Sequence, residues 1–246
     1  MTARFLQPVF AGLLALTVSG TPISAQTAPE TKPETPSEKF AALMLEIQTL
    51  QMRKRYLDSL AKLDEADKLE PGKAQTHNIR GSIYLSSQMR DINKAREEFK
   101  KAQEIEPEAM PSRFNLAEAD YIQGKFAAGA KGFADLLVKF PKIPTSVRHM
   151  VIFKQIVCQV KQGRLSEATK VMNDSFTFMD DTPAYYFCKA VIALQAKDEK
   201  TGNEWLAKAQ RIFKKHETGA YLDTLIEGHY IDSISLAKDT DQPVAQ

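Results

Sequence analysis

Apolar side chains recur along most of the chain with the spacing of amphipathic helices. From Lys39 to about residue 232 they fall every three or four positions, which places them on one face of a helix. Short stretches with Pro or Gly, such as Pro71-Gly72 and Gln123-Gly124, interrupt the pattern and mark where one helix ends and another begins. The pattern therefore predicts an all-α domain of many short helices over residues 39–232.

The clearest unit of this pattern is the stretch 74–107, which predicts two helices packed closely against each other. Small residues allow the helix backbones to approach, and aromatic residues fill the space between them. The residues that carry this prediction are Gly81, Tyr84, Ala95, Phe99, Ala102 and Pro107. Pro107 ends the second helix because it has no amide hydrogen and disfavours the helical conformation in the residue before it.

Two turns further along the chain share one sequence pattern. Gln-Gly-Lys-Phe contains Gly124, and Gln-Gly-Arg-Leu contains Gly163, 39 residues further on. Each Gly stands where a left-handed residue would end one helix, and the apolar residue that follows begins the next helix. The match indicates that pairs of helices repeat along the chain.

The stretch 74–107 resembles the tetratricopeptide repeat (TPR), whose signature is W-x2-L-G-x2-Y, A-x3-F and P with a period near 34 residues. Here His77 replaces the Trp and Arg80 replaces the Leu, so the second half matches better than the first. The resemblance extends over residues 39–232 and implies a TPR-like α-solenoid of about four antiparallel helix pairs. A C-terminal capping helix, over residues 218–231, is expected to cover the last exposed apolar face.

The first 25 residues are typical of a secretory signal peptide. Arg4 forms a short charged start, residues 5–18 are mostly apolar, and Ala25 ends a segment suited to cleavage. An uncleaved anchor helix is the alternative, but Pro8 interrupts an apolar run that is already short for a membrane span. We expect export to the periplasm or out of the cell, with no stable membrane anchor once the signal is cleaved.

Composition predicts two further segments and disfavours one class of partner. Residues 26–38 are rich in Pro, Thr and Glu and predict a flexible linker, and residues 233–246 predict a flexible tail. The net charge is +2, and it becomes +1 if Arg4 leaves with the signal, since residues 1–25 hold no other charged side chain. This balance does not favour a nucleic acid as the partner.

The sequence shows none of the motifs that would predict an enzyme. It has no GxSxG, P-loop or GxGxxG pattern. The four His residues are scattered, with no second His or Cys at the spacing of metal ligands. We therefore expect a non-enzymatic protein that needs neither a metal nor another cofactor.

The two cysteines can be linked or separate. Cys158 and Cys188 lie near corresponding positions of the predicted first helices of adjacent pairs. Such helices meet through opposite faces, so a disulfide is geometrically permitted, and export would place it where disulfides persist. Two separately buried thiols are the alternative, and the sequence leaves both open.

The resemblance also implies a binding groove. In TPR-like arrays the first helix of each pair lines a concave surface, and in members that hold peptides the residue three before the opening Gly points into it. The corresponding positions are Asn78, Asn115, Lys154 and Tyr186. Amide and ammonium groups can bond a peptide backbone or a carboxylate, and Tyr provides amphipathic contact. The family's carboxylate-clamp set is not reproduced.

These observations favour a protein- or peptide-binding adaptor or scaffold of the cell envelope that binds through the concave groove. One alternative is a structural component of an envelope or secretion assembly, which would bind through its convex face or self-associate. Another is an accessory subunit that holds an envelope enzyme. The identity of the partner does not follow from the fold.

Overall fold

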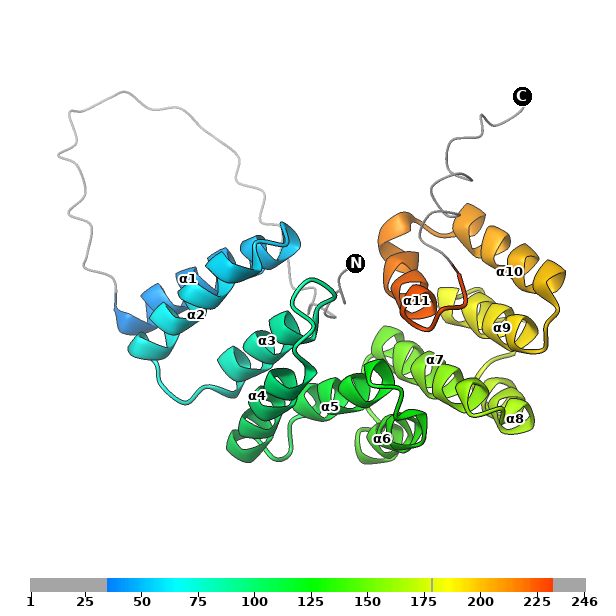
Figure 1. The fold of residues 1–246 in the computed structure, drawn as a ribbon, viewed down its shortest axis with the longest axis horizontal. Helices are drawn as coiled ribbons and strands as arrows, with labels where there is room; N and C mark the ends of the chain where they lie inside the picture. Colours follow the sequence, from blue (N-terminus) through cyan, green and yellow to red (C-terminus); the bar gives the residue numbers. More distant parts are fainter. Residues whose placement is uncertain (1–34, 178, 232–246) are drawn as a thin grey trace, which may run out of the picture. The chain divides into compact units, whose positions relative to one another are not determined.

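The computed structural model describes residues 35–177 and 179–231 of the chain. All regular secondary structure in these residues is helical, which confirms the all-α prediction (Figure 1). The helices are α1 Pro36–Met52, α2 Tyr56–Leu69, α3 Ala74–Leu85, α4 Ile92–Ile105, α5 Met110–Ile122, α6 Phe126–Lys139, α7 Thr145–Lys161, α8 Leu165–Ser175, α9 Pro183–Gln195, α10 Glu199–Ile212 and α11 Lys215–Glu227. The predicted signal peptide (1–25), most of the predicted linker (26–38) and the predicted tail (233–246) lie outside the described residues.

The described residues form two compact units that divide between Pro71 and Gly72, within the single repeat domain that the sequence predicts. The smaller unit is the α1–α2 hairpin. Its first helix begins at Pro36, inside the segment predicted as linker. This earlier start has a local cause, because Thr35 and Glu38 form a capping box and Pro36 suits the first helical position.

The larger unit contains four helix pairs followed by α11. The pairs are α3–α4, α5–α6, α7–α8 and α9–α10, and each packs against the next along the chain (Figure 1). With the α1–α2 hairpin, the described residues hold five pairs, where the sequence predicts about four. The solenoid of antiparallel pairs with a last single helix is the predicted fold class.

Helix α7 forms the centre of the larger unit's core. Its neighbours are α6, α8, α9 and α11, so it is covered on several sides. The run from Met150 to Val160 is buried except at Gln155, and Phe153 and Ile156 are fully buried. An apolar helix of this kind is stabilised mainly by removal of its side chains from water, at about 25 cal/mol per Å² of apolar surface.

The glycines of the two matching turns have the predicted backbone conformation. Gly124 has a φ of 76° and Gly163 a φ of 75°, both in the left-handed region. After each glycine, the next amide bonds back to the preceding helix, from Lys125 to the Asp120 carbonyl and from Arg164 to the Gln159 carbonyl. These bonds satisfy carbonyls that the helix end would otherwise leave unpaired.

Gly81 of α3 lies directly against the Phe99 ring of α4. A Cβ atom added there would lie 2.6 Å from Cδ1 of Phe99, whose side chain is fully buried. The prediction that a small residue lets these helices approach is therefore confirmed.

We expect Gly81→Ala to lower the free energy of unfolding by about 1–2 kcal/mol. Overpacking costs about 1–3 kcal/mol, which outweighs the gain of about 0.5–1 kcal/mol when Ala replaces a helical Gly. Urea titration followed by circular dichroism would measure the change, with the exposed Gln75→Ala on the same helix as the control. An unchanged or raised stability would show that Phe99 can move aside.

Candidate functional site

The first helices α3, α5 and α7 bring three of the four predicted groove residues onto one row of polar contacts. Asn115 is 2% exposed, and its Nδ2 donates a hydrogen bond to Oδ1 of Asn78, 3.3 Å away. Glu118, one turn after Asn115 on α5, continues the row to Lys154 on α7. The polar groups of successive first helices therefore contact one another, from α3 to α5 and from α5 to α7.

Lys154 is buried and fully engaged. Its Nζ lies 2.7 Å from Oε1 of Glu118, donates to Oγ1 of Thr224 at 3.0 Å and lies 5.6 Å from the centre of the Tyr121 ring. The side chains of Lys154 and Glu118 are only 8% and 6% exposed. The ammonium group thus balances a buried carboxylate and does not wait for an acidic group of a peptide, which the TPR resemblance implies.

Tyr186 belongs to a different cluster. Its ring contacts Tyr185, Trp205 and Phe213 at centroid distances of 5.5–5.7 Å. Its hydroxyl donates to Oδ1 of Asp181 at 3.0 Å, and partial burial followed by this hydrogen bond raises the pKa of the phenol. Tyr186 therefore packs on α10 and the segment after it, at the end of the solenoid.

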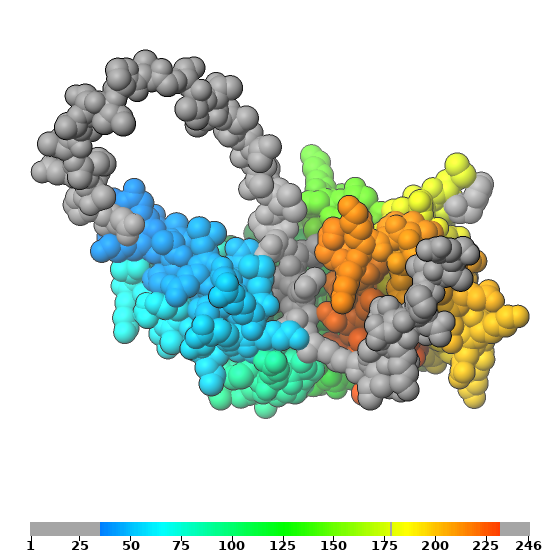
Figure 2. Space-filling view, turned by 90° about the horizontal axis from the view of Figure 1, so that it is seen from above, coloured from blue at the N-terminus to red at the C-terminus, as the bar shows by residue number. Residues whose placement is uncertain are grey.

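Helix α11 lies on the inner side of the first helices, where it contacts α7 and α9 (Figure 1). Tyr121 of α5 donates its hydroxyl to the Thr224 carbonyl at 2.7 Å. Arg90, in the turn after α3, donates to Oε1 of Glu227 at 3.2 Å. The capping helix that the sequence predicts is present, but it folds back along the solenoid, and in Figure 2 it is visible in orange and red at the surface of the larger unit.

The surroundings of Glu227 disfavour the charged form of its carboxyl group. Burial is the main cause that raises its pKa, and the Glu118 carboxylate raises it further, while Lys154 and Arg90 act in the opposite direction. Because the folded-state pKa is raised, the folded chain holds this proton at a pH where the unfolded chain has lost it. The contribution of Glu227 to stability therefore falls as the pH rises through its folded-state pKa.

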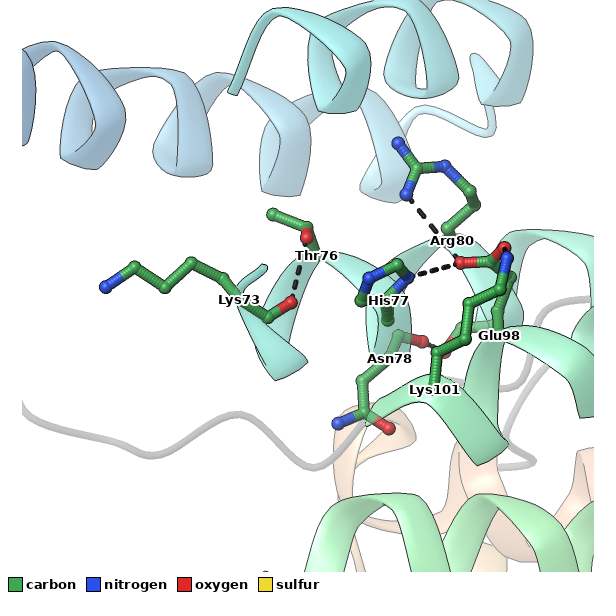
Figure 3. A network of polar contacts seen from close by, with 8 residues as sticks. Lys73, Thr76, His77, Asn78, Arg80, Glu98 and Lys101 are labelled. Carbon is green, nitrogen blue, oxygen red and sulfur yellow. Dashed lines mark hydrogen bonds and ion pairs between the residues drawn. The ribbon is translucent and has the colours of Figure 1, made fainter. Parts of the chain in front are cut away.

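A second polar cluster occupies the place where this chain departs from the TPR signature (Figure 3). The Glu98 carboxylate lies 2.6 Å from Nδ1 of His77, 2.8 Å from Nζ of Lys101 and 3.7 Å from Nη1 of Arg80. Burial acts to raise the pKa of Glu98, but the hydrogen bonds and charges of its partners outweigh it and hold the pKa below its usual value. His77 and Arg80 thus pack against α4 through a shared carboxylate.

The cysteines are two free thiols, both buried. Cys158 faces α6, where its Sγ would lie 3.1 Å from a Cβ at Gly129, and burial raises its pKa to about 12. Cys188 lies close enough to Tyr221 of α11 to raise the pKa of that phenol, a smaller effect than burial. The structure therefore contains the separate arrangement, one of the two that the sequence leaves open.

The described residues have few features of a metal site, a membrane-spanning helix or a small-molecule pocket. They contain no group of three or more His, Cys, Asp or Glu arranged to hold a metal ion, and no helix among them is long and apolar enough to cross a membrane. A depression of about 180 Å³ lies among α4, α5 and α6, next to Arg113 and Asp120. This volume is below the roughly 300–1,000 Å³ of ordinary small-molecule sites.

The residues that sequence reasoning missed are Glu118, Tyr121, Arg90, Thr224 and Glu227. Helical periodicity could have placed Glu118 and Tyr121 beside Asn115, because they follow it at steps of one turn. The other three contacts depend on where α11 packs, which no local pattern specifies.

The fold that these elements define is that of the TPR solenoids. The chain matches PilW, a widely conserved type IV pilus biogenesis factor, with a TM-score of 0.60 and 16% identity over 83% of this chain and 96% of that chain. It matches PilF of Pseudomonas aeruginosa with a TM-score of 0.57 and 12% identity over 83% and 98%. A tetratricopeptide repeat protein from Parabacteroides merdae gives 0.59 and 15% identity over 77% and 71%. No family model and no curated protein sequence matches.

We expect Lys154→Met to lower the free energy of unfolding by about 3–5 kcal/mol, because it leaves the buried Glu118 carboxylate without its counter-charge. The control is Lys170→Met, since Lys170 is 76% exposed in its pair with Asp174 and such pairs contribute about 0–1 kcal/mol. Chemical denaturation of both variants makes the measurement. A loss below about 1 kcal/mol for Lys154→Met would contradict a buried, desolvated pair.

Proposed function

We propose that this chain is a non-enzymatic scaffold that binds a protein or peptide segment on the inner face of its larger unit. One observation carries the proposal: that face holds a helix in the structure, through side chains that bond its backbone and its polar groups. Tyr121 donates to a main-chain carbonyl of α11, and Lys154 donates to a hydroxyl of the same residue, Thr224. Solenoids of stacked repeats commonly use such extended inner surfaces for binding.

We also propose that the protein acts outside the cytoplasm, in the periplasm or beyond. The support is the charged start, apolar run and small residue at the cleavage point in the first 25 residues. PilW, which shares the fold at 16% identity, is a type IV pilus biogenesis factor.

A structural part of an envelope or secretion assembly is the second candidate. Val138, on α6 of the larger unit, is 82% exposed and offers an apolar contact on the outer surface. An assembly role would use this outer surface for contact with other proteins. An accessory subunit that holds an envelope enzyme would use either face.

Photo-crosslinking in the producing cells separates the two faces. A benzoylphenylalanine residue at Gln75, exposed on α3 one turn before Asn78, should give a defined adduct with one protein. The same residue at Lys131, exposed on α6, is the matched control and should give none. Asn78→Ala should reduce the Gln75 adduct severalfold. If the probe at position 131 gives adducts and the probe at position 75 gives none, the partner binds the outer face. That result would favour a structural part of an assembly over the proposed scaffold.

A further inference from the structure

Helix α11 is anchored on the inner face by an aromatic contact. The Tyr221 ring stacks on Phe187 of α9 at a centroid distance of 5.2 Å and an interplanar angle of 21°. It also contacts the ring of Phe153 on α7 at 5.1 Å. Tyr221 is only 6% exposed, so this ring fills a site between the two helices.

Two polar residues on the same side of α11 follow the anchor at steps of three. Thr224 accepts hydrogen bonds at its carbonyl from Tyr121 and at its hydroxyl from Lys154, and Glu227 accepts from Arg90. Together with Phe153 and Phe187, these three donors form what we call the α11 seat. The seat thus binds an aromatic ring, a hydroxyl and a hydrogen-bond acceptor at positions i, i+3 and i+6 of a helix.

The seat is incompletely satisfied by α11. Oε2 of Glu118, next to the seat, is buried and has no hydrogen-bond partner. The carboxylate of Glu227 adds a second negative charge near Glu118, and burial, followed by the charge of Glu118, raises the pKa of Glu227. A carboxylate brought close to a buried carboxylate opposes docking, so a helix with a neutral amide in place of Glu227, whose oxygen can still accept from Arg90, would fit better.

The connection to α10 allows α11 to leave without breaking a helix. Phe213 and Lys214 between the two helices have extended backbone conformations, with ψ values of 147° and 153°. Helix α11 also has its own N-terminal hydrogen bond, from the Lys214 amide to Oε2 of Glu217 at 2.8 Å. It can therefore remain capped when it is undocked.

We propose that α11 is an intramolecular ligand, and that the α11 seat exchanges it for a helix of a partner protein with an aromatic residue, a Ser or Thr and a Gln at positions i, i+3 and i+6. This inference rests on the proposed function and names the surface and the class of partner. A tethered helix acts at an effective concentration of about millimolar, so the partner must bind more tightly than α11 or find α11 loosened. Because α11 fits the seat imperfectly, a better-fitting partner helix can bind the seat more tightly than α11 does.

The test uses a fluorescein-labelled synthetic peptide of residues 213–231 and the full-length chain, with binding followed by fluorescence anisotropy. The wild-type chain should bind it weakly because its own α11 fills the seat. Tyr221→Ala in the chain removes the internal anchor and leaves the seat residues unchanged, so the peptide should bind at least tenfold more tightly. A peptide that carries Glu227→Gln should bind about threefold more tightly still.

Three controls make the result specific. Tyr121→Phe added to the Tyr221→Ala chain removes one seat donor and should weaken binding several-fold. A peptide with Tyr221→Ala should not bind. Glu217→Ala, which weakens the start of α11 on its exposed side, loosens the helix by a second route and should give a smaller gain than Tyr221→Ala.

The proposal is overturned if the peptide binds neither loosened chain while circular dichroism shows both to be folded, because α11 would then be a fixed part of the core. Dimers of the wild-type chain that exchange α11 would assign the seat to a second copy and contradict a separate partner. If the peptide does not bind but benzoylphenylalanine at Gln75 still gives its protein adduct, only this inference is contradicted. If the peptide binds but benzoylphenylalanine at Gln75 gives no adduct, the proposed function is contradicted instead.

Discussion

The buried ion pair between Lys154 and Glu118 is the interaction on which the inner face of the larger unit depends. It joins α5 to α7 at 2.7 Å, and the same ammonium group donates to Thr224 of α11. Such a pair gains little net stability over apolar residues, since desolvation offsets most of the attraction. It does make the arrangement specific, because displacing either partner leaves a buried charge unbalanced. The hydrogen bond from Lys154 to Thr224 links α11 to this pair, beside the aromatic contacts of Tyr221.

The departures of this chain from the TPR signature have a physical explanation in the structure. The signature uses an apolar Trp and Leu at the positions that His77 and Arg80 occupy here. Glu98 on α4 meets both of these residues and Lys101, so an ionic contact joins the two helices where the signature would place an apolar one. Gly81 and Phe99 keep the close approach that the repeat requires. The pair therefore retains its geometry with a different set of contacts.

Much of the fold could be predicted from the sequence because it follows local rules. Amphipathic spacing gave the helices, and Gly124 and Gly163 marked turns whose backbone conformation only Gly adopts easily. The site was harder to predict from the sequence, because the burial of Lys154 depends on which helix covers it. A single Lys within the apolar run from Met150 to Val160 was a usable signal, because a charge there needs a buried partner. The placement of α11 involves contacts distant in sequence and has no local signature.

Native-state hydrogen exchange of α11 tests most directly whether the inner face holds this helix through Lys154. In the wild-type chain, the amides of Tyr221, Thr224 and Leu225 should exchange slowly. In Lys154→Met, their protection should fall by at least tenfold more than that of α3 and α4, because α11 loses its link to the ion pair. Equal loss of protection in all of these helices, or rapid exchange of α11 in the wild-type chain, would contradict the account.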